Sequence, residues 1–300
     1  MREKLLSKVL LVVGLAVLMC GLPMQASAIT FNFQQQTGYR VGSGDLLSND
    51  VTTPFNDIKW YNDPAAPVPV PAGSYANTLA WGASNNAGAD MSPNDPFGAY
   101  GNTGNPNTAY SGIRALGQQG GPFNVDTWVT ITELFHQNNP ILSNYHTLVG
   151  ATIDSVLKIG VGTPPPYGGP PTALADPSTI GLSFDETINQ SPCGPGSPTG
   201  TVCPDYFDIA AGGFNAVPFT YGPEDYLVYF QLVAGIGSTV SYLDLDSDSQ
   251  IDTIRIWTQE NQTSKAYVEM LVHRVPEPAT LTLLGFGLLG LVGFAKRRRM

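Results

Sequence analysis

Charged residues, cysteine and histidine are all scarce in this chain of 300 residues. Charged side chains make up 13% of the sequence, and 14 Lys and Arg stand against 24 Asp and Glu, which gives a net charge of −10. A surface this acidic repels nucleic acid and other polyanions, so a nucleic-acid-binding protein is excluded. The three cysteines have a spacing that fits no zinc-binding pattern.

Long apolar runs are confined to the two ends of the chain. The first run covers residues 9–22, follows three cations within residues 2–8, and precedes the small residues Ala26 and Ala28. This order predicts a secretory signal peptide over residues 1–28, which signal peptidase cuts after Ala28. The run is short for a membrane span, so an uncleaved N-terminal anchor is the less favoured interpretation.

The second apolar run covers residues 279–295 and contains no charged side chain. As a helix rising about 1.5 Å per residue it would span about 25 Å, so it predicts a transmembrane helix in a thin or adapted bilayer. Cations next to a span stay in the cytoplasm, which places the preceding residues outside. The cations here are Lys296, Arg297, Arg298 and Arg299.

The end of the chain combines "VPEPAT" (275–280), one apolar helix and an arginine-rich terminus. Residues 276–300 therefore resemble the PEP-CTERM sorting tail of exported bacterial proteins. The resemblance implies that exosortase, a membrane-embedded protease-transpeptidase, recognises the tail and cuts at or near Pro276, Glu277 and Pro278. It also implies passage through the inner membrane to the cell surface or extracellular matrix of an exopolysaccharide-producing bacterium with an outer membrane. The alternative is an ordinary C-terminal anchor.

The body, residues 29–275, keeps seven cations and 22 acidic residues and so has a net charge of about −15. Its length suits one domain, and strand-like runs recur between segments rich in Gly, Pro and Asn. These features predict an all-β fold, an antiparallel, jelly-roll-like β-sandwich with long loops. The runs are residues 29–36, 127–136, 147–160, 178–188, 225–234, 251–260 and 266–275.

Six short segments of the body also resemble the THxN-type family of PEP-CTERM proteins. Phe135 stands where that family has threonine, before His136, Gln137 and Asn138. The resemblance implies an extracellular β-rich domain and supplies no catalytic residue. The segments are "LAWG" (79–82), "YSGIR" (110–114), "ITELFHQNNPI" (131–141), "FDETINQ" (184–190), "CPDYFDI" (203–209) and "WTQEN" (257–261).

Two cysteines, Cys193 and Cys203, remain once the signal peptide is removed. An even number of cysteines in an exported protein predicts a disulfide, and closing so short a loop stabilises the fold by about 2–3 kcal/mol. The competing interpretation is a pair of metal ligands, but no histidine lies near them in the sequence.

An alternating acidic stretch, "DLDSDSQID" (244–252), offers a candidate calcium site. Calcium prefers six to eight oxygen ligands, which alternating aspartates in a turning loop can supply. Ser249 stands where such loops have glycine, and Arg255 stands where an EF-hand has its bidentate glutamate. An acidic, solvated turn is therefore the competing interpretation. The candidate ligands are Asp244, Asp246, Asp248, Gln250 and Asp252.

Other titratable residues give no clear catalytic pattern. His136 and Glu133 are three apart in a predicted strand and so point to opposite faces, which favours a structural histidine over a zinc ligand. A glycosidase would need two carboxyls about 5–10 Å apart across a cleft. The sequence cannot place its candidates, Glu186, Glu224, Asp225 and Glu260, at such a separation.

The sequence as a whole predicts an exported, non-enzymatic surface or matrix protein. Its expected role is structural or adhesive, in contact with extracellular polysaccharide, with signal peptidase and exosortase as partners during export. Two alternatives stay open. One is a secreted carbohydrate-active enzyme, and the other is a calcium-dependent glycan-binding module.

Overall fold

The computed structural model describes most of the predicted body. The described residues are 29–43, 45–47, 59–61, 66–71, 75–81, 111–138, 147–161, 174–185, 197–198, 203–260, 262–276 and 287. The predicted signal peptide lies outside them, as does the predicted transmembrane helix apart from Gly287. Within the described residues, no helix has the length and apolar character that crossing a membrane requires.

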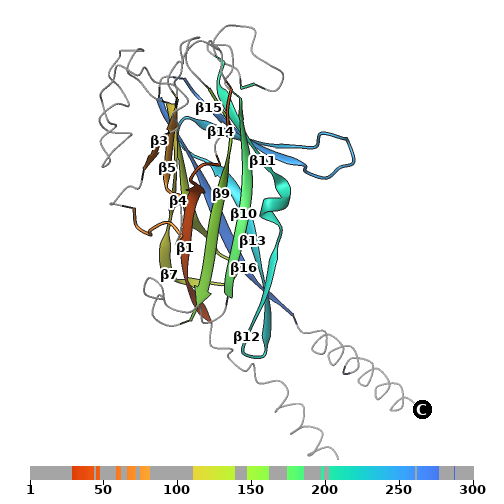
Figure 1. The fold of residues 1–300 in the computed structure, drawn as a ribbon. Helices are drawn as coiled ribbons and strands as arrows, with labels where there is room; N and C mark the ends of the chain where they lie inside the picture. The colour runs from red at the N-terminus through yellow and green to blue at the C-terminus, as the bar shows by residue number, and fades with distance from the viewer. Residues whose placement is uncertain are drawn as a thin grey trace, which may run out of the picture.

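The described residues form two antiparallel sheets (Figure 1). Sheet A contains, in order, β14 (Ser238–Leu243), β15 (Thr253–Thr258), β11 (Asp205–Ala210), β10 (Leu174–Asp185), β9 (Thr147–Gly160), β1 (Thr30–Arg40) and β4 (Tyr75–Ala76). Two further strands extend it, because β2 (Asp45–Leu47) pairs with β9 and β7 (Gln119–Asn124) pairs with β1.

Sheet B lies behind the long strands of sheet A in Figure 1. Its order is β12 (Val217–Tyr221), β13 (Glu224–Ala234), β16 (Gln262–Val275), β8 (Trp128–Asn138), β6 (Ser111–Gly117), β5 (Thr78–Trp81) and β3 (Lys59–Tyr61). A single 3-10 turn, η1 (Ala211–Phe214), connects β11 to β12. The predicted antiparallel β-sandwich is confirmed, and each of the seven predicted runs overlaps one of its strands.

Side chains that alternate along the strands fill the space between the sheets with two apolar clusters. One cluster includes Trp81, Phe184 and Phe207 and lies towards the β5 and β11 side. The other is built around Phe31 and Tyr226, whose rings meet edge to face with centroids 5.2 Å apart. The core is thus divided, and the region between its two parts contains the site described below.

The two sheets join where β6 leads directly into β7. The backbone N–H of Gln35 in β1 donates to the carbonyl of Gln118, while the N–H of Gln118 donates to the carbonyl of Ile131 in β8, both at 2.8 Å. Gln118 therefore connects sheet A to sheet B on this side. On the opposite side, β11 pairs only with residues 182–185 of β10, so the rest of that strand has one open edge.

Candidate functional site

A band of polar side chains crosses the inner face of sheet A, between the two apolar clusters. In one row, Gln35 of β1 is paired with Leu157 of β9, which is paired with Asp176 of β10. The next row consists of Thr37, Ser155 and Ser178 in the same strands. Residues paired across a sheet point to the same face, so both rows face the interior.

Polar groups in such a place are costly unless they find hydrogen-bond partners. The hydroxyls of Ser155 and Ser178 satisfy this rule with a hydrogen bond of 2.7 Å. Gln35 does not, since its side chain is 5% exposed and its Oε1 has no hydrogen-bond partner among the described residues. Burial also raises the pKa of the Asp176 carboxyl above its ordinary value.

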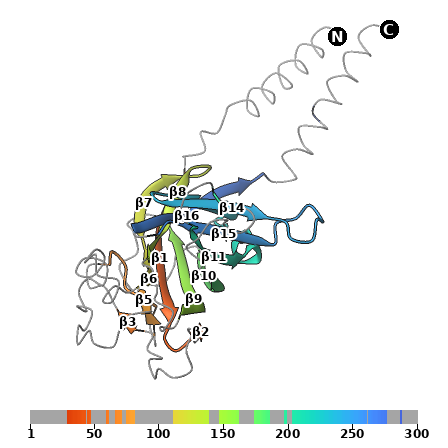
Figure 2. The same cartoon turned by 90° about the horizontal axis from the view of Figure 1, so that it is seen from above.

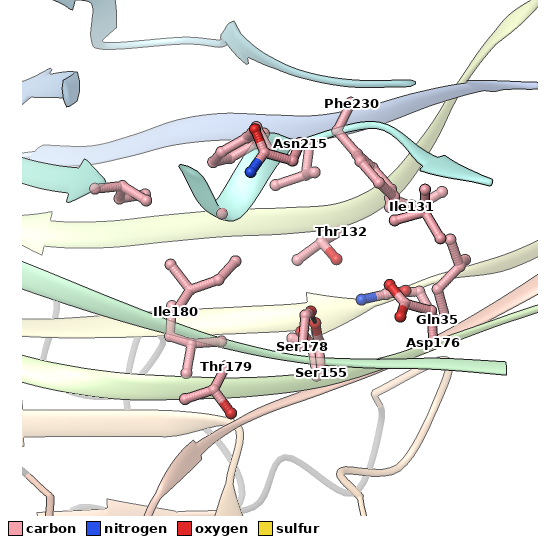
Figure 3. A pocket seen from close by; sticks show the side chains of 18 of the residues that line it. Gln35, Ile131, Thr132, Ser155, Asp176, Ser178, Thr179, Ile180, Asn215 and Phe230 are labelled. Carbon is pink, nitrogen blue, oxygen red and sulfur yellow. Dashed lines mark hydrogen bonds between the residues drawn. The ribbon is translucent and has the colours of Figure 1, made fainter. Parts of the chain in front are cut away.

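This polar band forms one wall of a pocket of about 250 Å³ between the sheets. The opposite wall comes from sheet B and is mainly apolar, with Ile131, Leu134, Phe230 and Val268 beside the polar residue Thr132. In Figure 3, Gln35 and Asp176 lie at one end of the pocket, and Ser155 and Ser178 lie together beside them.

The pocket lies where sheet A has its open edge. Gly212, Gly213 and Phe214 of η1 line it, together with Asn215 at the end of that turn and Val217, the first residue of β12. Figure 3 shows the Asn215 and Phe230 side chains across the pocket from Ser178. One polar and one apolar wall suit a small ligand that has both kinds of surface.

The acidic stretch forms the loop of the β14–β15 hairpin, which projects from the sandwich in both views (Figures 1 and 2). Carboxylate oxygens of Asp244, Asp246 and Asp252 all lie within 4.8 Å of one another. Among the described residues, this is the one group of acidic, His or Cys side chains close enough to hold a metal ion.

The other two candidate ligands of the loop bond to each other. The backbone and side-chain nitrogens of Gln250 donate to the two carboxylate oxygens of Asp248, at 2.7 and 3.1 Å. Ser249 adopts a φ of 72°, so it makes the sharp turn for which glycine was expected. Arg255 lies in β15 and donates to both oxygens of Asp208 at 2.7 Å, so it belongs to an ion pair between strands.

His136 is a buried core residue, 3% exposed. Its ring stacks on Trp81 at 5.8 Å and meets Phe207 edge to face at 4.7 Å. Its Nδ1 forms a hydrogen bond of 2.7 Å with the hydroxyl of Thr258. Burial lowers the pKa of His136 to about 3, so the ring is neutral at physiological pH.

The segments that suggested the THxN resemblance meet around this histidine. Trp81, Phe184, Phe207 and Thr258 come from four of the six segments, and all contact His136. Their convergence places these segments in one part of the core but assigns them no chemistry. The family resemblance of the body remains a prediction.

Of the four acidic candidates for a glycosidase, the structure describes three, and it places Glu224 far from Glu260. Glu224 lies at the start of β13, next to the end of β16, where it pairs with Arg274. Glu260 precedes the start of β16, so the length of that strand, about 45 Å for 14 residues, separates the two. Asp225 accepts a hydrogen bond from Thr220 at 2.9 Å, and Glu186 lies outside the described residues.

Cys203 is buried at 1% exposure and takes part in a disulfide. Cys193 lies outside the described residues, so the Cys193–Cys203 pairing stays a prediction. The signal-cleavage residues Ala26 and Ala28 also lie outside them, as do Glu277, Pro278 and the four terminal cations.

The last strand of the sandwich, β16, ends at Val275, and Pro276 follows it directly. Proline cannot donate to a strand ladder, which gives the strand a sharp end at the predicted sorting motif. The fold and this boundary define an all-β body joined directly to a C-terminal tail.

A protein-family model described as the PEP-CTERM protein-sorting motif matches residues 274–299. The match supports an exported protein that is sorted by exosortase, is anchored in the membrane in transit, and then reaches the cell surface. No curated protein matches the chain.

The polar band is the feature that reading the sequence missed. In "TFNFQQQTGYR" (30–40), the positions that face the core are Phe31, Phe33, Gln35, Thr37 and Tyr39. Two polar residues thus interrupt an aromatic series that alternates with period two. That interruption was visible in the sequence and would have indicated a polar site inside the sandwich.

Proposed function

We propose that this protein is a non-enzymatic component of the cell surface or extracellular matrix that associates with exopolysaccharide. The observation that carries the proposal is the sorting motif placed directly after the last strand of a single sandwich. Exosortase would then release or transfer the whole sandwich, since every strand that the structure describes precedes the cut.

The pocket supports a binding role over catalysis. Among the described residues that line it, Asp176 is the one acidic side chain. Glycoside hydrolysis ordinarily requires a second carboxyl across the substrate. The secreted carbohydrate-active enzyme is therefore the weaker alternative.

Calcium-dependent binding is the second candidate, and the convergence of Asp244, Asp246 and Asp252 favours it. Three carboxylates on a projecting hairpin could hold calcium at the surface, where a bound ion can also coordinate sugar hydroxyls.

Localisation and processing test the main proposal. An epitope tag placed after Ala28 should appear outside the inner membrane, and mass spectrometry should show a C-terminus at or near residues 276–278. Replacing Pro276, Glu277 and Pro278 together with alanine should leave unprocessed precursor in the inner membrane. The matched control is Pro218→Ala in the edge strand β12, which should be processed normally.

Polysaccharide association is tested separately. The protein should co-sediment with extracellular polysaccharide and should be released into the medium by a strain that makes none. A cytoplasmic location of the tagged protein, or equal retention on cells with and without polysaccharide, would refute the proposal.

A further inference from the structure

We infer that the pocket between the sheets binds one neutral sugar ring, through the Gln35 amide and its polar neighbours. The inference rests on the proposed association with polysaccharide and names the site and the unit that it would recognise. It begins from Gln35, a residue that is 5% exposed and lines the pocket, with its amide nitrogen directed into the pocket (Figure 3).

The polar groups at one end of the pocket define what the ligand must offer. The amide nitrogen of Gln35 points into the pocket and donates hydrogen bonds, whereas the carboxylate of Asp176 at the same end accepts them (Figure 3). A ligand that pairs with both groups must therefore accept and donate, as sugar hydroxyls do, and hydroxyls can also pair with the nearby serines.

The opposite wall selects for a ring with an apolar face. Phe230, Ile131 and Val268 face the polar band across the pocket. A pyranose can present its hydroxyls to one wall and its C–H groups to the other. An ammonium ion fits less well, because Thr37, Thr132, Ser155 and Ser178 are neutral and Asp176 is the one charged group among the described lining residues.

The size of the pocket limits the ligand to about one ring. Its volume of about 250 Å³ is below the roughly 300–1,000 Å³ typical of sites for drug-sized ligands. We therefore expect it to hold a single residue, such as the end or a side branch of a polysaccharide, and not several residues of its backbone.

The test uses the full chain, purified in an amine-oxide detergent so that no detergent sugar competes. Saturation-transfer NMR would probe a panel of methyl glycosides of glucose, galactose, mannose and N-acetylglucosamine. At least one should bind, and Gln35→Leu should weaken that binding about tenfold or more, since the lost hydrogen bonds leave ligand hydroxyls unpaired. The melting temperature of the Gln35→Leu variant should be equal to or higher than that of the native protein, because the substitution removes a buried amide whose Oε1 is unpaired among the described residues.

The adjacent residue supplies a matched control. Gln34 is 0% exposed, and both of its side-chain polar atoms lack a partner among the described residues. It points to the opposite face of β1, away from the pocket. Gln34→Leu should therefore change stability in the same direction as Gln35→Leu and leave sugar binding intact.

Three results would overturn the inference. One is the absence of binding by every member of the panel, and another is equal weakening by the two glutamine variants. The third is that glucosamine, added as a cationic probe, binds while no neutral glycoside does and that Asp176→Asn abolishes its binding, which would identify a cation site. If the native protein did not associate with polysaccharide in cells, the proposed function would be refuted. That outcome is distinct from failure of this inference, because sugar binding is measured on the purified protein.

Discussion

At the scale of single residues, the hairpin loop contains a backbone conformation that its sequence does not favour. Ser249 has a φ of 72°, in the left-handed region where a Cβ is unfavourable. We expect Ser249→Gly to raise the free energy of unfolding by about 0.5–1 kcal/mol, since glycine adopts this conformation without the steric penalty. Urea denaturation measures the change.

Ser241 provides the control for that substitution. It lies in β14, paired with Arg255, and is not among the positive-φ residues of the described chain. Ser241→Gly should destabilise the protein by about 0.5–1 kcal/mol, because glycine weakens a strand interior. Equal effects of the two substitutions would show that the turn at Ser249 is not strained.

His136 makes stability depend on pH. Its pKa is lowered to about 3 by burial in the folded protein, against about 6.5 when unfolded, so the unfolded state binds more protons between these values. Stability is fully present above pH 6.5 and should fall by about 2 kcal/mol between pH 7 and pH 5. Urea denaturation at several pH values between 7 and 5 would measure this loss of stability.

The pH effect should disappear when the ring can no longer titrate. We expect His136→Phe to flatten the slope between pH 6.5 and pH 5, a range in which ordinary carboxyls stay ionised. His273→Gln is the control, because His273 is exposed beside Asp126. An unchanged slope in His136→Phe would mean that another group causes the dependence.

At the scale of strands and loops, Gly117 is needed where the two sheets join. A Cβ on Gly117 would lie 1.9 Å from the carbonyl oxygen of Gln35 in β1. Gly117→Ala should therefore force β6 and β1 apart and destabilise the protein by about 3 kcal/mol. Gly181→Ala in β10 is the control, since a Cβ there meets nothing within 4 Å. It should be neutral or stabilise by about 0.5 kcal/mol. Similar denaturation midpoints for both variants would contradict the close approach.

The acidic hairpin loop gives the calcium prediction. If Asp244, Asp246 and Asp252 bind calcium, a concentration of about 100 Kd should stabilise the protein by about 2.7 kcal/mol and raise its melting temperature by about 5–10 °C. Asp246→Ala should abolish the shift. Asp225→Ala removes one exposed charge far from the loop, so this variant should still show the calcium-induced rise in melting temperature. No shift in the native protein, or the same shift in Asp246→Ala, would leave the loop as a solvated turn.

The strands that the sequence predicted are those whose apolar alternation is regular, such as 147–160 and 266–275. It failed to predict β7, which contains Gly120, Gly121 and Pro122, because its pairing with β1 depends on the junction between the sheets. The predicted run for β10 also began too late, at residue 178 after Pro177, whereas the strand begins at Leu174. Proline is tolerated there because this half of β10 has an open edge.

Regular alternation also fails within β8. Strict alternation puts Ile131 and Thr132 on opposite faces, but both line the pocket. The pairing of β8 with β16 shifts between Val268 and Glu269, a bulge that reverses the alternation at this point. Sequence periodicity cannot locate a bulge, because the bulge depends on the partner strand. The site was therefore missed although Gln35 and Thr37 interrupt the aromatic series of β1.

At the scale of the whole molecule, the described strands begin and end close to the two predicted processing sites. The first strand begins at Thr30, just after the predicted signal cleavage, and the last ends at Val275, just before the sorting motif. Every strand of both sheets thus lies between the two predicted cuts. Processing at both sites would leave the sandwich whole.

Deleting residues 279–300 should therefore separate stability from location. We expect the melting temperature to change by less than about 2 °C, since no packed strand is lost. The protein should move from the membrane fraction to a soluble fraction outside the inner membrane, because the predicted span is gone. A chain that ends at Asn261 is the contrast, since it lacks β16, which lies between β13 and β8 in sheet B, and should not fold. A large loss of stability on deletion of 279–300 would show that the tail packs against the body, and exosortase would then act on a segment already bound to its own domain.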